Sequence, residues 1–171
     1  MSKNNIWKRL RLVVLVLLLV PAVLSIALWA ALRLSLNHPG GTFSVSGLEQ
    51  PVFIHFDHRQ RPFVRAASIK DALWAEGWLH ARYRLWQMEL LRRAGRGRLA
   101  QGLGEGLLES DRALWRAGVP QLAKRLESAS SGELLKQVDA YLAGVNEAIR
   151  ANRTRPPEFW LAGLESQSWI R

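Results

Sequence analysis

The sequence predicts a mainly α-helical protein with a short N-terminal β-hairpin, preceded by one transmembrane helix. Three observations support this prediction. Residues 12–32 form an uncharged apolar stretch of 21 residues, long enough to cross about 30 Å of hydrocarbon as a helix. Residues 42–56 contain two short segments in which apolar and polar side chains alternate, as they do in strands. Residues 68–104 hold three of the eight tryptophans and repeat apolar side chains at helical spacing.

Basic residues flank the apolar stretch unevenly. Only Arg33 follows it before Arg59, whereas four basic residues precede it: Lys3, Lys8, Arg9 and Arg11. This excess of positive charge favours a cytoplasmic N-terminus. We therefore predict a basic cytoplasmic stretch over residues 1–11 and a transmembrane signal anchor over residues 12–34. The protein would cross the inner membrane once, with its bulk periplasmic or extracellular.

A cleaved secretory signal is the alternative interpretation of this segment. Such signals have an apolar core of about 7–15 residues that ends in small residues at the cleavage site. Here the apolar core is longer, and Leu28 and Trp29 occupy positions where small residues would be needed. We therefore expect the anchor to stay uncleaved.

Composition excludes several kinds of chemistry. The chain has no cysteine, so disulfides, thiolate metal sites and a cysteine nucleophile are excluded. The net charge is +10, but five of the basic residues flank the apolar stretch and the remainder is only mildly basic. Residues 92–98 contain four arginines, a pattern that a nucleic-acid patch would also show. A helix C-terminus with Gly95 or Gly97 as its stop explains them better, and we expect no nucleic-acid partner.

The N-terminal part of the globular region predicts a linker and a hairpin. Residues 35–41 include the turn-forming run Asn37 to Gly41 and are interpreted as the linker. Thr42–Ser46 and Val52–Phe56 are the expected strands, joined by Gly47–Pro51.

The long helix that follows is expected to form the core. Two adjacent apolar stripes predict burial on most sides; they comprise Trp74, Trp78, Ala81, Leu85, Met88 and Leu91, and beside them Leu79, Tyr83, Trp86 and Leu90. Glu89 and Arg93 have the spacing of an i,i+4 ion pair. Ser68 is a candidate N-cap, with Asp71 as the acidic partner of a capping box.

Histidines and aspartates near this helix raise two further hypotheses. The first is a metal site among His55, His58, His80, Asp57 and Asp71, and the second is a Ser68–His80–Asp71 triad. The first set lacks a recognised ligand spacing, and sequence order cannot establish the spatial geometry of a triad. Helix capping accounts for Ser68 and Asp71 more simply. We assign no catalytic, cofactor-binding or metal-binding residue in this chain.

Three more helices are predicted downstream, over residues 107–118, 119–128 and from about Ser131 to Arg155. The last has a clean apolar stripe at a period of 3.6 residues, comprising Leu134, Leu135, Val138, Tyr141, Leu142, Val145 and Ile149. Gly144 inside it would cost about 1 kcal/mol relative to Ala, which indicates a close helix contact. Asn146 is expected to bind backbone across that contact.

Several short strings, in order, resemble the penicillin acylase family. They are Gly77-Trp78-Leu79-His80-Ala81, Arg84-Leu85-Trp86-Gln87-Met88-Glu89, Arg92-Arg93, Gly97-Arg98-Leu99-Ala100, Tyr141 to Asn146, and Pro156 to Gly163 with Trp169. The chain departs from the family pattern at four positions: Gln60 stands for Gly, Phe63 for His, Tyr83 for Asp and Gln101 for Glu.

The resemblance implies an N-terminal-nucleophile hydrolase with an αββα fold. Such relatives are precursors that cut themselves and expose a serine, which attacks an amide carbonyl with its own α-amine as base. Their nucleophile, oxyanion donors, calcium ligands and acyl-pocket residues lie downstream of the position of Trp169. Residues 42–171 would therefore be the incomplete N-terminal part of such a domain, matching only the scaffold of the smaller subunit.

The expected function follows from this resemblance. The chain would be the N-terminal fragment of an amidohydrolase acting on N-acyl amides, inactive alone, with the remainder of its own precursor (the large subunit) as partner and calcium only in the full-length protein. The alternative is a non-catalytic, membrane-tethered helical remnant or accessory protein. Alone, the chain would leave apolar faces such as Trp74, Trp78 and Leu85 uncovered.

Two of the departures carry structural expectations. A glycine missing at Gln60 matters if that position has a positive φ. Without an aspartate at position 83, Arg84 would lose its usual partner, and Asp111 or Glu109 is the expected replacement.

Overall fold

The computed structural model describes the chain except residues 1–2, 37–39 and 153–155. Residues 37–39 of the predicted linker and Arg155 therefore lie outside the described residues. The chain divides into two compact units, residues 1–36 and residues 37–171, and each is described by itself.

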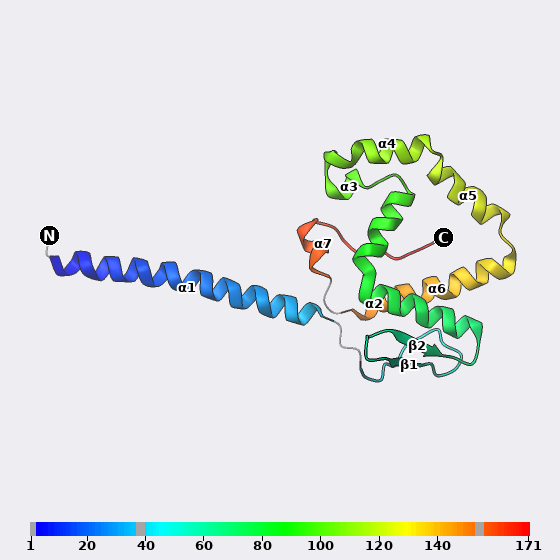
Figure 1. Cartoon of the computed structure of the whole chain (residues 1–171), viewed down its shortest axis with the longest axis horizontal. Helices are drawn as coiled ribbons and strands as arrows, with labels where there is room; N and C mark the ends of the chain where they lie inside the picture. Colours follow the sequence, from blue (N-terminus) through cyan, green and yellow to red (C-terminus); the bar gives the residue numbers. More distant parts are fainter. Residues whose placement is uncertain (1–2, 37–39, 153–155) are drawn as a thin grey trace. The chain divides into compact units, whose positions relative to one another are not determined.

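The first unit is one long helix, α1 (Lys3–Ser35), drawn in blue in Figure 1. Pro21 lies inside it without ending it. The part from Arg11 to Ser35 is long and apolar enough to cross a membrane, and none of it is buried. Signal sequences near an N-terminus can also be long and apolar enough to meet this criterion, so the finding does not separate the two interpretations of the N-terminus.

The second unit begins with a two-stranded antiparallel sheet. It pairs β1 (Phe53–Phe56) with β2 (Pro62–Arg65), with Phe53 opposite Arg65 and His55 opposite Phe63. The turn is closed by Asp57, whose carboxylate accepts the backbone N–H groups of Arg59 and Arg61 at 2.9 Å each.

The predicted strand at Thr42–Ser46 is wrong, because the structure pairs β1 with residues 62–65 instead. The alternation in residues 42–46 has another cause. The ring of Phe43 lies 5.2 Å from that of Trp78, and Val45 packs against the hydrophobic core. This segment thus buries apolar side chains against a helix without joining a β-ladder.

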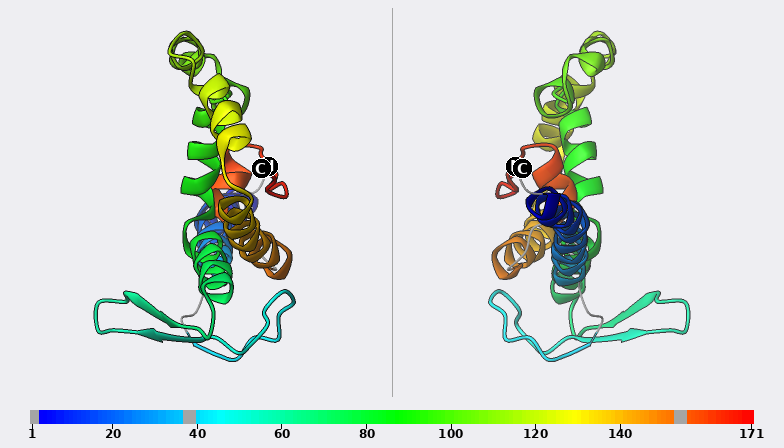
Figure 2. Two further views of the ribbon diagram at one scale, coloured as in Figure 1. Left: turned by 90° about the vertical axis from the view of Figure 1, so that its right-hand side faces the viewer. Right: turned by 90° about the vertical axis from the view of Figure 1, so that its left-hand side faces the viewer.

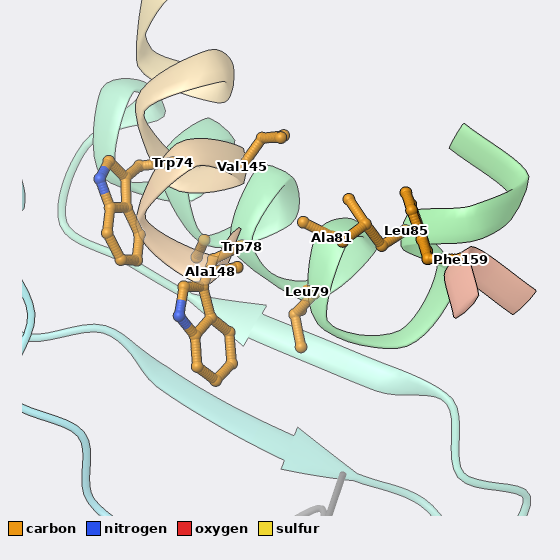
Figure 3. Close-up of a cluster of buried hydrophobic side chains, with 9 residues drawn as sticks. Trp74, Trp78, Leu79, Ala81, Leu85, Val145, Ala148 and Phe159 are labelled. Carbon is orange, nitrogen blue, oxygen red and sulfur yellow. The ribbon is translucent and has the colours of Figure 1, made fainter. Parts of the chain in front are cut away.

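The centre of the unit is a pair of packed helices, α2 (Ile69–Gly95) and α6 (Gly132–Ala151), which we call the α2–α6 platform. Figures 1 and 2 show the two helices crossing side by side. Their core combines Trp74, Trp78, Leu79, Ala81 and Leu85 with Val145, Ala148 and Phe159 (Figure 3). The expectation that Trp74, Trp78 and Leu85 would be uncovered is therefore wrong, because α6, the hairpin region and the C-terminal segment bury them.

The apolar stripes are buried only in part. On α2, Leu91 and Tyr83 are exposed, and on α6 so are Leu134 and Val138. The buried face of α6 is instead built mainly from small residues: Ala140, Gly144, Val145 and Ala148, together with Glu147. Helix α6 contacts α2 with its C-terminal half, and Leu134 and Val138 lie outside that contact.

A peripheral arm follows α2, consisting of α3 (Ala100–Leu103), the 3₁₀ turn η1 (Glu105–Leu107), α4 (Leu108–Arg116) and α5 (Val119–Ala129). We call residues 100–129 the α3–α5 arm. Figure 2 shows it at the end of this unit opposite the hairpin. A short helix, α7 (Pro157–Leu161), and the C-terminal segment then return to the platform.

Candidate functional site

Two glycines allow the platform helices to touch backbone to backbone. A Cβ added to Gly144 would lie 1.8 Å from the carbonyl oxygen of Trp74, and one added to Gly77 would lie 2.1 Å from that of Tyr141. Neither distance is compatible with a side chain. The close helix contact predicted from Gly144 is confirmed, and it fixes the spacing on which the other contacts depend.

Two buried carboxylates attach the segment before the hairpin to the platform. The Oδ1 atom of Asp71 accepts the backbone N–H of Glu49 at 2.9 Å. The Oε2 atom of Glu147 accepts the hydroxyl of Ser46 at 3.1 Å and is also paired with Arg150. Residues far apart in the sequence are thus held together by acceptors that α2 and α6 supply.

The predicted N-cap of α2 is confirmed at Ser68, but the predicted role of Asp71 in a capping box is wrong. The hydroxyl of Ser68 accepts the N–H of Asp71 at 3.0 Å, as an N-cap does. The Asp71 carboxylate binds Glu49 instead of returning to the backbone of Ser68. Its second oxygen is buried and has no hydrogen-bond partner among the described residues.

A buried charge cluster lies in the C-terminal half of α2. The side chain of Glu89 is 1% exposed and accepts from Arg93 at 2.8 Å, which confirms the predicted i,i+4 pair. It also accepts two hydrogen bonds from Arg92, at 2.8 and 2.9 Å. The guanidinium of Arg92 lies 5.4 Å from the centre of the Trp169 ring. One carboxylate thus joins two cations and places them beside the C-terminal segment.

The expectation for Arg84 is wrong. This residue is exposed, and it donates to Gln87 at 3.3 Å, not to Asp111 or Glu109. Its backbone is non-helical (φ −139°, ψ 25°) and marks a kink in α2. The kink leaves Tyr83 on the surface, where its ring meets that of Phe56 edge-on. An exposed arginine needs no buried anion, so the substitution at position 83 is tolerated here.

Asp111 does not pair with Arg84 and instead caps the start of α3. Its two carboxylate oxygens accept the N–H groups of Leu99 and Ala100 at 2.7 and 2.8 Å. Helix α2 ends within the arginine-rich stretch that precedes α3, as predicted, and Gly97 at φ +60° is the stop. The indole of Trp115 donates to the carbonyl of Gly97 at 3.2 Å. These contacts connect α4 to the end of α2.

The C-terminal segment is held by a side-chain clamp on α6. Asn146 donates to the carbonyl of Trp169 at 2.9 Å and accepts its N–H at 2.7 Å. The prediction that Asn146 binds backbone is confirmed, but the backbone belongs to the C-terminal segment and not to α2. Beside this clamp lies an open pocket of about 440 Å³, lined by Glu127, Asp139, Leu142, Asn146, Trp169, Ile170 and Arg171.

The histidines and aspartates considered from the sequence do not meet in one place. His80 shares a hydrogen bond of 3.0 Å with the Tyr141 hydroxyl, while Ser68 and Asp71 are occupied at the helix cap. Burial, and then the charge of Glu76, raise the pKa of Tyr141, so the phenol keeps its proton. The backbone N–H of Arg61 lowers the pKa of Asp57, which serves the hairpin turn.

The family resemblance implies calcium only for the full-length protein, and the described part of the chain offers no cluster of metal-ligating side chains for it. That part contains no group of three or more His, Cys, Asp or Glu side chains able to hold a metal ion. Its buried carboxylates, Asp71, Glu89, Asp111 and Glu147, accept hydrogen bonds from N–H, guanidinium or hydroxyl groups instead.

The chain belongs to the penicillin amidase family. The sequence profile described as Penicillin amidase matches residues 51–171, which contain the hairpin, the platform and the arm. The four strings on α2 and its C-terminus that carry the resemblance supply the core tryptophan Trp78, Gly77 and the Glu89 cluster. The family pattern is therefore a pattern of packing and charge pairing.

Two curated relatives and one solved structure illustrate the match. Penicillin acylase 2 proenzyme of Pseudomonas sp. (strain SE83) is 36% identical over 139 residues, which are 81% of this chain and 18% of that proenzyme. Acyl-homoserine lactone acylase QuiP of Pseudomonas syringae pv. syringae (strain B728a) is 32% identical over 130 residues, which are 75% of this chain and 16% of QuiP. The chain thus spans less than a fifth of the length of these relatives.

The solved structure is the thermostable penicillin G acylase from Alcaligenes faecalis. It matches with a TM-score of 0.62 and 24% sequence identity, covering 71% of this chain and 67% of that chain. At this identity the likeness is one of fold. The two chains share the mainly helical arrangement with a short hairpin.

Proposed function

We propose that this chain is the N-terminal, small-subunit part of a precursor acylase that hydrolyses linear N-acyl amide bonds. The family match over residues 51–171 carries the proposal. The packed α2–α6 platform supports it, because several strings that resemble the family supply residues of its hydrophobic core. The relatives act, by their names, on penicillin and on acyl-homoserine lactones. Either acyl amide suits the proposal.

The chemistry is proposed to reside outside residues 1–171. An N-terminal serine of the large subunit would attack the amide carbonyl, its α-amine would take the proton, and oxyanion donors would hold the developing charge. This chain would contribute the scaffold on which the large subunit assembles. Calcium, which the resemblance implies, is likewise assigned to the remainder of the precursor. The length of the relatives compared with this chain supports that division.

The proposal includes a location. Helix α1 would serve as an uncleaved anchor in the inner membrane, with residues 1–11 in the cytoplasm and the second unit outside. The length and composition of Arg11–Ser35 and the basic residues before it support this placement.

The first test is the coding sequence beyond codon 171. We expect the frame to continue and to contain a serine preceded by a small residue at a self-cleavage point. The complete product should then hydrolyse aryl-acyl or fatty-acyl nitroanilides, and a Ser→Ala change at that point should abolish both self-cleavage and hydrolysis. Residues 1–171 alone should release no product. A stop codon directly after Arg171 would overturn the enzyme proposal and leave a non-catalytic, membrane-tethered protein.

A further inference from the structure

The outward face of the β1–β2 hairpin has an unusual composition. Cross-strand partners point to the same side of a sheet, so Phe53 with Arg65 and His55 with Phe63 form one face. On this face the two phenylalanines alternate diagonally with the two basic side chains. Phe53 is 61% exposed and Phe63 is 55% exposed. The opposite face packs against the platform through Ile54 and Phe56. The exposed aromatic rings therefore have no cover within the described structure.

The charges around this face are positive and mostly uncompensated. The acidic side chains nearby are already paired, Asp57 with Arg61 and Glu49 with Lys70. Arg59 and Arg65 are exposed and form no ion pair among the described residues. The guanidinium of Arg65 instead lies 5.3 Å from the centre of the Phe53 ring. The hairpin thus presents two free cations beside two exposed aromatic rings.

The hairpin is also close to the candidate membrane helix along the chain. Helix α1 ends at Ser35 and β1 begins at Phe53. A chain of that length spans at most roughly 60 Å when fully extended. If α1 crosses a bilayer, the connection keeps the hairpin near its surface at a high effective concentration. Aromatic side chains favour the headgroup boundary, and arginines near an anionic surface are attracted to it.

We propose that the outward face of the β1–β2 hairpin docks on the anionic bilayer surface, with Phe53 and Phe63 at the headgroup boundary and Arg59 and Arg65 on lipid phosphates. This inference rests on the membrane anchoring given under the proposed function. The free cations favour lipid over an added protein strand as the occupant, because an apolar strand would leave both guanidinium groups without an anion. Two arginines should favour an anionic over a neutral surface by roughly 30-fold.

Residues 1–171 contain no cysteine, so a single introduced cysteine can be labelled selectively in this chain. His55→Cys would place an environment-sensitive fluorophore between the two phenylalanines, and Ser128→Cys on the α3–α5 arm would serve as the matched exposed site. The chain is inserted through α1 into vesicles of phosphatidylcholine, with or without phosphatidylglycerol. We expect a blue shift and quenching by brominated lipid at position 55 only in the anionic vesicles, and no change at position 128.

Charge reversal and salt sharpen the test. Arg59→Glu with Arg65→Glu should abolish the blue shift, whereas Arg112→Glu with Arg116→Glu on α4, an equal change in net charge, should leave it intact. Should the hairpin variant disturb folding, raising salt to about 1 M shortens the screening length to about 3 Å and should reduce the shift in the unreversed chain.

Each remaining result has a defined meaning. A fluorophore at position 55 that stays in water with both lipids, or that shifts equally in both, overturns the inference. Carbonate extraction separates this failure from that of the anchor. If the chain resists extraction while the fluorophore stays in water, anchoring stands and docking fails. If carbonate releases the chain, both proposals fail.

Discussion

Helices α2 and α4 carry the same local pair, a glutamate followed three residues later by an arginine. On α2, Glu89 and Arg92 have side chains that are 1% and 12% exposed. On α4, Glu109 and Arg112 have side chains that are 70% and 55% exposed. The spacing allows both pairs to form, and both are present, yet only the first is removed from water. The surroundings, and not the spacing, decide how much such a pair contributes to stability.

The same contrast holds for whole helices. Both α5 and α6 are amphipathic, but α5 has no buried residue and its Leu122 and Leu126 stay exposed. Helix α6 is buried where Ala140, Gly144 and Ala148 let it approach α2. Large apolar side chains thus do not by themselves produce the tight contact. Small residues at the crossing point produce it.

The largest expected effect separates the two glutamates. Glu89→Ala should leave two nearly buried arginines without their anion and lower the free energy of unfolding by about 3–5 kcal/mol. Glu109→Ala removes an exposed pair and should cost less than about 1 kcal/mol. Urea unfolding of the full chain in detergent, followed by tryptophan fluorescence, measures both. Equal losses for the two variants would contradict the comparison.

The second prediction concerns the helix contact. Gly144→Ala would force the backbones of α2 and α6 apart. Overpacking typically costs about 1–3 kcal/mol, and we expect a loss of free energy of unfolding at or above the upper end of that range. Gly132→Ala, in the same helix, has no atom within 4 Å of the added Cβ and should be neutral or slightly stabilising. The same unfolding measurement applies. A Gly144→Ala protein as stable as the parent would show that the platform tolerates a wider spacing.

The third prediction concerns the connection between arm and platform. Asp111→Asn presents an amide to the N–H groups of Leu99 and Ala100, so at most one carbonyl oxygen remains to accept from them. We expect a loss of about 1–2 kcal/mol and faster amide hydrogen exchange in α3. Asp139→Asn, which weakens a half-exposed pair with Arg171, should change stability by less than about 1 kcal/mol. Unchanged exchange in α3 would remove Asp111 from this role.

The smallest expected effect is at the hairpin turn. Gln60 has φ +58°, as expected if its position is one where the family has glycine. Gln60→Gly should relieve this conformation, but it also increases the entropy of the unfolded chain. We expect a net stabilisation of about 0.5 kcal/mol or less. The control variant Arg59→Gly, at the neighbouring position, should not raise the free energy of unfolding. Destabilisation by Gln60→Gly would mean that the turn has no strain to relieve.

The sequence by itself determined the features that depend on local spacing. These include the apolar segment of α1, the cap at Ser68, a glycine stop at Gly95 or Gly97, the Glu89–Arg93 pair and the family pattern. Each follows from a few neighbouring residues, whose geometry is fixed once a helix forms. The close contact at Gly144 was also predictable, since glycine destabilises a helix interior and is expected there where a neighbouring helix leaves no room for a side chain.

Only the tertiary structure decided which groups meet across the chain. Strand β1 pairs with residues 62–65 because Asp57 closes that turn, while Phe43 and Val45 pack on α2. Asp71 binds Glu49, Asp111 caps α3, and Asn146 holds Trp169. Each carboxylate or amide has several suitable donors in the sequence. The packing of α2 on α6 brings one of them within reach, and a contact of this kind has no local signature.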